Sequence, residues 1–174
     1  MVPRLILFDG LPGTGKSSLA QNVGQTLGIP VLGRDWIAAA LLDFLNEVNP
    51  NDAAHAVMAV IAERQFALGH SVIFDCVVGN VERRTRWTEL AAKHGAALCP
   101  IQCICSDAEL HRARMEGRQR GIPGWPELTW DHVEEVRSRY ELWPDALLTV
   151  DSVNSFEDNL RAVLLCLKEA VLAD

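Results

Sequence analysis

The chain has 174 residues, of which 49% are hydrophobic and 22% are charged. This length predicts one domain over residues 1–174, and the apolar content argues against intrinsic disorder. Sixteen Lys and Arg against twenty-three Asp and Glu give a net charge of −7. A protein that coats DNA needs a net positive field, so the charge disfavours that class.

The N-terminus and the cysteines favour a protein of the cytoplasm. Only four apolar residues separate Arg4 from Asp9, about half of what a secretory signal needs. The longest apolar run, Trp36–Leu42, is much shorter than the ~18 residues of a membrane span. Five cysteines without paired spacing are typical of reduced thiols, and the second ligand pair of a zinc site is missing. We therefore expect a cytoplasmic protein without a membrane segment.

Strand-like and helix-like segments alternate along the chain. Short apolar runs favour buried strands, and longer runs with helical spacing favour helices that end at Gly or Pro. The first elements expected are a strand over Leu5–Phe8, a helix over Lys16–Leu27, a strand at Val31–Leu32, a helix from Trp36 with Asp35 as its N-cap, and a helix over Asp52–Leu68. The next are a strand over Ser71–Phe74, a helix over Glu82–His94, a strand over Ala97–Cys105, a helix over Asp107–Arg120, a loop over Gly121–Pro126, a helix over Asp131–Leu142, a strand over Leu147–Val150 and a helix over Phe156–Val171. Such alternation predicts an α/β fold, a three-layer doubly wound parallel sheet with helices on both faces.

The segment Ala97–Cys105 allows two more specific expectations. Proline lacks a backbone donor, so Pro100 is expected near the start of this strand or at a sheet edge. Cys99, Cys103 and Cys105 share parity, so we expect them on one face of the sheet as small buried residues.

The strongest motif is Gly10-Leu11-Pro12-Gly13-Thr14-Gly15-Lys16-Ser17, a full match to G-x-x-x-x-G-K-[ST] between a predicted strand and a predicted helix. Glycines let backbone N–H groups approach a phosphate closely, and the helix N-terminus adds positive potential. Lys16 can reach the β- and γ-phosphates, and the Ser17 hydroxyl can bind Mg²⁺. The motif therefore predicts binding of a nucleoside triphosphate with Mg²⁺, and ATP is the nucleotide expected. The expected nucleotide-binding residues are Gly10, Leu11, Pro12, Gly13, Thr14, Gly15, Lys16, Ser17, Ser18 and Arg114.

Two classes of P-loop protein do not fit the sequence. A GTPase carries D-x-x-G and N-K-x-D, but the run from Asp75 to Gly79 has the wrong spacing and no N-K-x-D occurs. A large ATPase motor needs more chain than this for its lid domain. A small kinase or a nucleotide-dependent switch remains.

Two carboxylates follow predicted strands, whose ends surround the ligand crevice in this topology. Asp35 is predicted to be the general base, which accepts the proton of a substrate hydroxyl and orients it for in-line attack. A role as helix cap is compatible with that function. Asp75 can hold a water on Mg²⁺ or touch the substrate, and its structural alternative is a turn residue at a strand end.

Four arginines lie within nine residues: Arg112, Arg114, Arg118 and Arg120. Arg114 and Arg118 would share a helix face, and guanidinium groups can stabilise charge on a phosphoryl group in transfer. The loop that follows contains two glycines and two prolines, as expected of a lid that closes over ATP. Residues 107–126 are therefore predicted to form an Arg-rich helical lid, and a solvated basic helix face is the alternative.

Several segments together resemble the P-loop kinases grouped around the polynucleotide kinase domain and the zeta-toxin-like kinases. They are GLPGTGKSSLA, the segment VLGRD that ends at Asp35, VIFDCVVGN followed by Arg84, the Arg-x-x-x-Arg pair Arg114 and Arg118, and the aromatic-Glu pair Tyr140-Glu141. The resemblance runs from Leu5 to about Val150. It implies a P-loop NTPase kinase fold and ATP-dependent phosphorylation of a hydroxyl, with Asp35 at the position of the general base.

The acceptor side departs from this group. Ala38 stands where many members have an Arg that helps hold the acceptor, and Cys76-Val77-Val78 replaces a small-plus-Thr pattern. Both changes make the acceptor side more apolar and argue against phosphorylated or polynucleotide acceptors. The residues that could shape an apolar pocket are Trp36, Val77, Val78, Trp87 and Trp125, and core packing explains Trp87 equally well. Among the histidines, only His111, which flanks the lid, is a candidate for a role.

These observations predict a kinase that phosphorylates a hydroxyl of a small molecule such as an antibiotic, a sugar, a nucleoside or a metabolite. The alternatives are a kinase of polynucleotide 5′-hydroxyl ends, which the net charge opposes, and a non-catalytic ATP-binding regulator. The oligomeric state stays open. The expected catalytic residues are Asp35, Lys16, Arg114 and Arg118; the substrate-binding residues are Asp35, Trp36, Asp75, Val78, Asn80 and Arg84; the metal-binding residues are Ser17 and Asp75.

Overall fold

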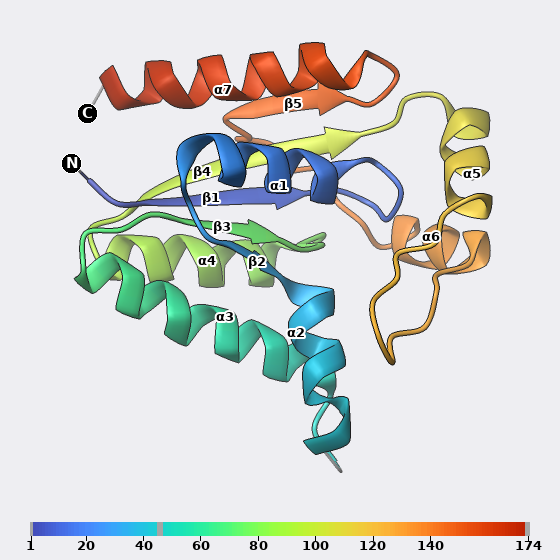
Figure 1. Ribbon diagram of the computed structural model, residues 1–174, viewed down its shortest axis with the longest axis horizontal. Coiled ribbons are helices and arrows are strands. Elements are labelled where there is room, and N and C mark those ends of the chain that lie inside the picture. The colour runs from blue at the N-terminus through green and yellow to red at the C-terminus, as the bar shows by residue number, and fades with distance from the viewer. Residues whose placement is uncertain (1, 45–46, 173–174) are drawn as a thin grey trace.

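The computed structural model describes residues 2–44 and 47–172, which form a five-stranded parallel sheet with helices on both faces (Figure 1). The strands are β1 (Arg4–Asp9), β2 (Val31–Gly33), β3 (Val72–Asp75), β4 (Ala97–Ile104) and β5 (Leu148–Asp151), in the spatial order β2-β3-β1-β4-β5. The helices are α1 (Lys16–Leu27), α2 (Arg34–Leu41) with the 3₁₀ turn η1 (Leu42–Phe44), α3 (Pro50–Ala67), α4 (Val81–Lys93), α5 (Ala108–Glu116), α6 (Trp130–Arg137) and α7 (Phe156–Leu172). The three-layer doubly wound fold predicted from the sequence is confirmed. No helix of this described part is long and apolar enough to cross a bilayer.

Strand β1 lies at the centre of the sheet, between β3 and β4, and all six of its residues are buried. Its side chains enter two cores. Leu7 belongs to the core against α3 and α4, and Phe8 belongs to the core against α1 and α7 (Figure 1). Because both faces of the sheet are covered, the strands are continuous apolar runs rather than alternating ones. Asp9, the last residue of β1, lies at the carboxyl edge of the sheet.

Helix α2 begins earlier than predicted. It starts at Arg34 with Gly33 as its N-cap, so the prediction that Asp35 caps a helix from Trp36 is wrong. Asp35 instead lies in the first helical turn, where a negative charge complements the helix dipole. Its carboxylate is therefore directed to side chains rather than to the backbone of its own helix.

Helices α5 and α6 are shorter than predicted. The helix expected over Asp107–Arg120 ends at Glu116, and α6 also ends early, at Arg137. After α6 the backbone turns toward the segment before α4, where the N–H of Glu141 donates to the carbonyl oxygen of Gly79 (3.0 Å). This contact joins residues far apart in sequence, so the early end of α6 could not be predicted from local residue types.

Strand β4 departs from one prediction and partly agrees with another. Pro100 lies in the middle of this interior strand, so the expectation of a strand start or a sheet edge is wrong. Its carbonyl oxygen accepts from the N–H of Leu147 (2.8 Å), just before β5 begins. The nitrogen of a strand residue points to the same side as its carbonyl, so the missing N–H removes no hydrogen bond from the ladder. Cys99 and Cys103 are buried in one core as predicted, whereas Cys105 lies beyond the strand.

Candidate active site

The predicted phosphate loop connects β1 to α1 at the carboxyl edge of the sheet (Figure 1). Gly10 lies so close to β4 that a Cβ there would be 2.2 Å from the carbonyl oxygen of Cys103, and Gly13 has a φ of +90°. Both positions therefore require glycine. The buried Thr14 donates from its hydroxyl to the carbonyl oxygen of Leu11 (2.9 Å), which closes the loop on itself. The resulting loop leads directly into the N-terminus of α1, the arrangement that binds phosphate in other proteins.

Asp9 supports this loop, and the sequence analysis missed it. The residue is fully buried, and its Oδ1 accepts from the backbone N–H groups of Gly10 (2.7 Å) and Val78 (2.8 Å). Burial raises the pKa of Asp9, while these hydrogen bonds and the charge of Lys16 oppose the rise. The carboxylate thus joins the start of the phosphate loop to the segment after β3. The available signal was an acidic residue at the end of an apolar strand, directly before the motif.

Helix α5 packs on the other side of the loop. A Cβ on Gly13 would be 2.7 Å from the Sδ of Met115, and the Nε2 of His111 lies 2.6 Å from the carbonyl oxygen of Pro12. Because a carbonyl only accepts, Nε2 carries the proton and Nδ1 accepts from Nη2 of Arg137 (3.1 Å). Burial lowers the pKa of His111; the bond to Pro12 opposes this shift and the charge of Arg137 adds to it. His111, flagged in the sequence because it flanks the lid, therefore links α6 to the loop.

Asp35 lies where β2 passes into α2, and two arginines contact its carboxylate. Oδ2 is 2.6 Å from Nη1 of Arg120, and Oδ1 is 2.7 Å from Nη2 of Arg34. Arg120 comes from the segment after α5 and was not among the predicted site residues. The pair is 85 residues apart, and helical spacing directed attention to Arg114 and Arg118 instead.

Asp75 and Trp36 line an open cleft of about 300 Å³ at the β2 edge of the sheet. Asp75 is paired in register with Gly33 across the β2–β3 ladder, and Trp36 is 51% exposed. Oδ1 of Asp75 is buried and has no hydrogen-bond partner among residues 2–44 and 47–172. A buried carboxylate oxygen of this kind calls for a donor or a cation. The residues around the cleft are Gln21, Val31, Leu32, Gly33, Trp36, Ile37 and Asp75.

The donor set at this edge fits Mg²⁺. Within the described residues there is no cluster of three or more His, Cys, Asp or Glu side chains that could hold a metal ion. Mg²⁺ at phosphate-transfer sites needs only one or two protein ligands, because waters and substrate phosphates complete its shell. Ser17 lies one helical turn before Gln21, which lines the same cleft as Asp75, so a hydroxyl and an unpartnered carboxylate oxygen are available there.

The two arginines predicted to act together have different surroundings. Arg114 is exposed on α5. Its charge acts on Asp151: burial raises the pKa of Asp151, but hydrogen bonds and the charge of Arg114 outweigh burial, so the pKa is lowered. Arg118 lies beyond the end of α5 and is half-buried; burial lowers its pKa, and the charge of Arg120 adds to this shift. The carboxylate of Asp75 acts on Arg118 in the opposite direction. The charge of Arg118 therefore interacts with Asp75 at the site, whereas the charge of Arg114 interacts with Asp151 at the end of β5.

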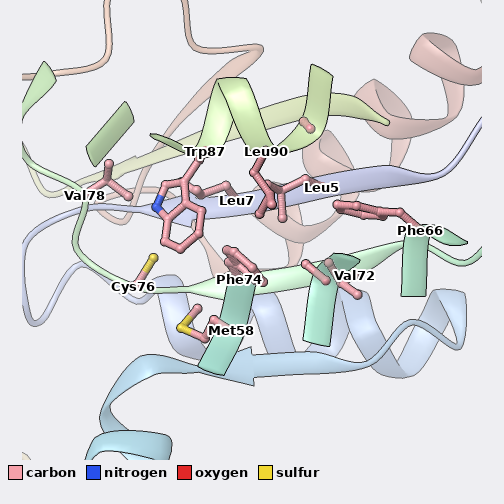
Figure 2. Close-up of a cluster of buried hydrophobic side chains, with 12 residues drawn as sticks. Leu5, Leu7, Met58, Phe66, Val72, Phe74, Cys76, Val78, Trp87 and Leu90 are labelled. Carbon is pink, nitrogen blue, oxygen red and sulfur yellow. The ribbon is translucent and has the colours of Figure 1, made fainter. Parts of the chain in front are cut away.

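Val78 and Trp87 belong to the core. Both side chains are fully buried, and Figure 2 shows them in one cluster with Cys76 and Phe74. The ring of Trp87 lies edge-on to Phe74, with ring centroids 5.0 Å apart. The prediction that the Val78 side chain binds the substrate is therefore corrected, because an apolar core surrounds it. For Trp87, core packing is the explanation that the structure supports.

Arg84 and Asn80 make structural contacts. Arg84 is only 7% exposed, donates to the carbonyl oxygen of Glu141 and lies over the ring of Trp143 at 5.5 Å. The side-chain oxygen of Asn80 accepts from the N–H of Arg83 (2.9 Å) and caps α4. Arg84 thus fixes the segment after α6 onto α4, and its predicted contact with the substrate would require that segment to move.

Two curated relatives are similar to part of the chain. Uncharacterised proteins of Mycobacterium tuberculosis and Mycobacterium bovis are each 34% identical to it over 113 residues, which are 58% of this chain and 23% of those proteins. The chain thus spans less than a quarter of the length of the curated relatives it matches.

Solved structures share the fold over nearly the whole chain. A candidate kinase from Chloroflexus aurantiacus is 25% identical, with a TM-score of 0.77 and coverage of 97% of this chain and 98% of that one. The APS kinase of Mycobacterium tuberculosis in complex with AMPPNP and APS is 21% identical, with a TM-score of 0.71 and coverage of 96% and 98%. A gluconokinase from Sinorhizobium meliloti is 19% identical, with a TM-score of 0.67 and coverage of 97% and 93%.

One protein family covers most of the chain. Residues 5–142 match AAA_33, described as an AAA domain. The matched range includes the phosphate loop, Asp35, Asp75 and the arginine-rich segment. The resemblance to P-loop kinases inferred from the motifs is thereby confirmed, and the chain belongs to the AAA_33 family of AAA domains and has the fold of P-loop kinases.

Proposed function

We propose that this chain is a kinase that transfers the γ-phosphoryl group of ATP to a hydroxyl of a small molecule. In this proposal residues 1–174 act as one kinase domain and residues 107–126 act as its lid. The observation that carries it is the convergence of the phosphate loop, Asp35 and Asp75 at the carboxyl edge of the parallel sheet, with α5 and α6 beyond that edge (Figure 1). Open α/β sheets bind their ligands at this edge. The kinase folds among the structural neighbours, a gluconokinase included, support a small acceptor.

The nucleotide would bind through its phosphates. The backbone N–H groups between Gly10 and Ser17 would receive the β-phosphate, and Lys16 would offset charge on the β- and γ-oxygens. Mg²⁺, held by Ser17 and Asp75, would neutralise charge on the same oxygens. Arg118, half-buried beside the acidic edge, would meet the charge that develops on the transferring group.

The acceptor would bind beside Asp35, with Trp36 as an apolar wall. Its hydroxyl oxygen would attack the γ-phosphorus while the proton passes to the Asp35 carboxylate and ADP leaves. The cleft beside Asp75 is lined by Val31, Leu32 and Ile37, which favours acceptors with an apolar part.

A panel of acceptors tests this proposal. Purified protein with ATP and Mg²⁺ is incubated with sugars, nucleosides, aromatic alcohols, amino alcohols and a 5′-hydroxyl oligonucleotide, and phosphorylated products are identified by mass spectrometry. We expect transfer to a small acceptor, and we expect Lys16→Ala to abolish it. Transfer to the oligonucleotide alone would favour a polynucleotide kinase. ATP binding without transfer to any compound would favour a non-catalytic regulator.

A further inference from the structure

Arg120 is fixed by its own loop before it reaches Asp35. Its backbone N–H donates to Oε1 of Glu127 (2.9 Å), its Nε lies 3.4 Å from Oε2 of the same carboxylate, and its Nη2 donates to the carbonyl oxygen of Pro126. The N–H of Gly121 donates to Glu127 as well (3.3 Å). The side chain is only 7% exposed. The guanidinium is therefore held in place by residues 120–127 independently of its contact with α2.

The remaining arm of this guanidinium covers Oδ2 of Asp35. Nη1 of Arg120 lies 2.6 Å from Oδ2, while Arg34 faces Oδ1 at 2.7 Å. Arg34 is in turn bonded to the side chain of Asn51 on α3. Oδ2 thus accepts a charge-assisted hydrogen bond, which is stronger than a neutral one, whereas Oδ1 is buried beside the charge of Arg34 and accepts no hydrogen bond from the residues described. Arg120 therefore places a donor on Oδ2, where a base needs a free lone pair.

The structure also indicates which arginine is available for the phosphates. The guanidinium of Arg118 makes no hydrogen bond or ion pair with the residues described, although the residue is half-buried and the charge of Asp75 raises its pKa against the larger effect of burial. Arg120, by contrast, makes contacts with Asp35, Glu127 and Pro126. The two side chains therefore suit different tasks, Arg118 at the phosphates and Arg120 at the base.

We propose that Arg120 is a positioning residue that shields Asp35 until an acceptor displaces it, and so suppresses ATP hydrolysis by water. The inference rests on the proposed function of Asp35 as general base. Water attack would form a bond from water oxygen to the γ-phosphorus, release ADP and give the water proton to Asp35, and this step needs Oδ2 free. A water molecule has little binding energy with which to move a fixed guanidinium. An acceptor that also contacts the cleft at Trp36 can use that binding energy to do so.

The test is ATP hydrolysis without acceptor, measured as ADP and phosphate release by the wild type and five variants. Arg120→Met is expected to raise the rate roughly tenfold, less than the ~10²-fold or more that a positioned base contributes, because water is not held in place as an acceptor would be. The double variant Arg120→Met with Asp35→Asn is expected to return to the rate of Asp35→Asn alone. Arg161→Met is the matched control, because this exposed arginine on α7 pairs only with Asp158 among the residues described and should leave the rate unchanged. A structural defect would lower hydrolysis, so a rise that depends on Asp35 is specific to the shield.

Glu127→Ala keeps Arg120 but removes the carboxylate that holds it, so the rate of ATP hydrolysis should rise by less than in Arg120→Met. This variant tests the shield if Arg120→Met does not fold. An unchanged or lower rate in a folded Arg120→Met protein overturns the shield, and a lower rate would assign Arg120 to the phosphates. A rise that persists in the double variant overturns it as well. Failure of the proposed function differs from these results: no compound in the acceptor panel would be phosphorylated, even if the Asp35-dependent rise were present.

Discussion

The Nε2 of His111 on α5 lies 2.6 Å from the carbonyl oxygen of Pro12, so the helix after β4 is bonded directly to the phosphate loop. On its other nitrogen the same ring accepts from Arg137 of α6. The rings of Trp130 and His111 lie edge-on to each other, and the guanidinium of Arg137 lies over the Trp130 ring, 5.1 Å from its centroid. A movement of α5 and α6 would therefore be transmitted to the residues that surround the phosphates.

Substitution of His111 should change ATP affinity according to the hydrogen bonds that survive. His111→Ala removes the bond to Pro12 and the bond from the Arg137 guanidinium, and it should weaken binding of a non-hydrolysable ATP analogue about tenfold, the order expected for the loss of one buried hydrogen bond. His111→Gln can still donate to Pro12 and accept from Arg137, so its affinity should stay close to that of the wild type. Isothermal titration calorimetry measures both values. Equal affinity in all three proteins would remove His111 from the support of the loop.

The same residue predicts a pH dependence. Burial and the charge of Arg137 lower the pKa of His111, so the neutral form is held at pH 7. Protonation would place an N–H on Nδ1 against the donor Nη2 of Arg137, so affinity for the analogue should fall as acidification protonates the ring. The phosphates of the analogue also titrate, so the relevant quantity is the ratio of wild-type to His111→Gln affinity at each pH. A constant ratio from pH 7.5 to pH 5 would contradict the prediction.

The motif and the alternation of elements predicted much of this arrangement because they depend on local properties. Gly13 and Lys16 follow from a loop whose backbone geometry restricts residue type, and the sheet follows from buried apolar runs such as that ending at Asp9. The approach of Arg120 to Asp35 was beyond this reasoning. Helical spacing extended α5 to Arg120, whereas the helix ends at Glu116 and the chain then folds back toward α2.

The sequence did not predict the roles of two buried residues, Val78 and Asp9. Val78 could be read as a pocket residue because a sequence does not show which face of a loop is covered, and Figure 2 shows its side chain within the core. Asp9 gave a weak signal, since its partners are backbone N–H groups of Gly10 and Val78 rather than a recognisable side chain. A residue whose partners are backbone groups cannot be recognised from the spacing of side-chain types, because every residue type except proline offers a backbone N–H.

Asp35→Asn should separate binding from transfer. An amide cannot accept the hydroxyl proton, so turnover with an active acceptor should fall by ~10²-fold or more while ATP affinity stays nearly unchanged. Asp43→Asn, in the exposed turn η1 that follows α2, is the matched control and should retain wild-type turnover. Full transfer by Asp35→Asn would show that the base is another group.

Trp36→Ala should act on the acceptor and not on ATP. The half-exposed indole borders the cleft beside Asp75, and its loss should raise the KM for an acceptor with an apolar part about tenfold, with little change in kcat. Trp36→Phe should restore most of the affinity. Phe44→Ala removes an aromatic side chain that is 80% exposed and lies outside the cleft, so its KM should equal that of the wild type. An unchanged KM in Trp36→Ala would place the acceptor elsewhere.

His55 makes the stability of the fold depend on pH. It lies on α3, 3% exposed, with its ring edge-on to Trp87 at 5.7 Å. Burial, together with the charges of Arg34, Arg83 and Arg86, lowers its pKa from 6.5 to about 4. The unfolded chain therefore binds more protons than the folded chain between these values, so acidification destabilises the fold in this range. Through His55 alone, the free energy of unfolding should fall by about 2 kcal/mol from pH 7 to pH 5.

His55→Leu, which fills similar space with an apolar group, should remove this part of the pH dependence. Urea unfolding at pH 7 and pH 5 gives the free-energy difference for each protein, and the variant should lose less stability on acidification than the wild type by about 2 kcal/mol. His70→Gln is the control, since His70 is exposed and contacts only the side chain of Gln65 among the residues described. The interpretation fails if His55→Leu and the wild type lose the same stability, because the proton uptake would then belong to other groups.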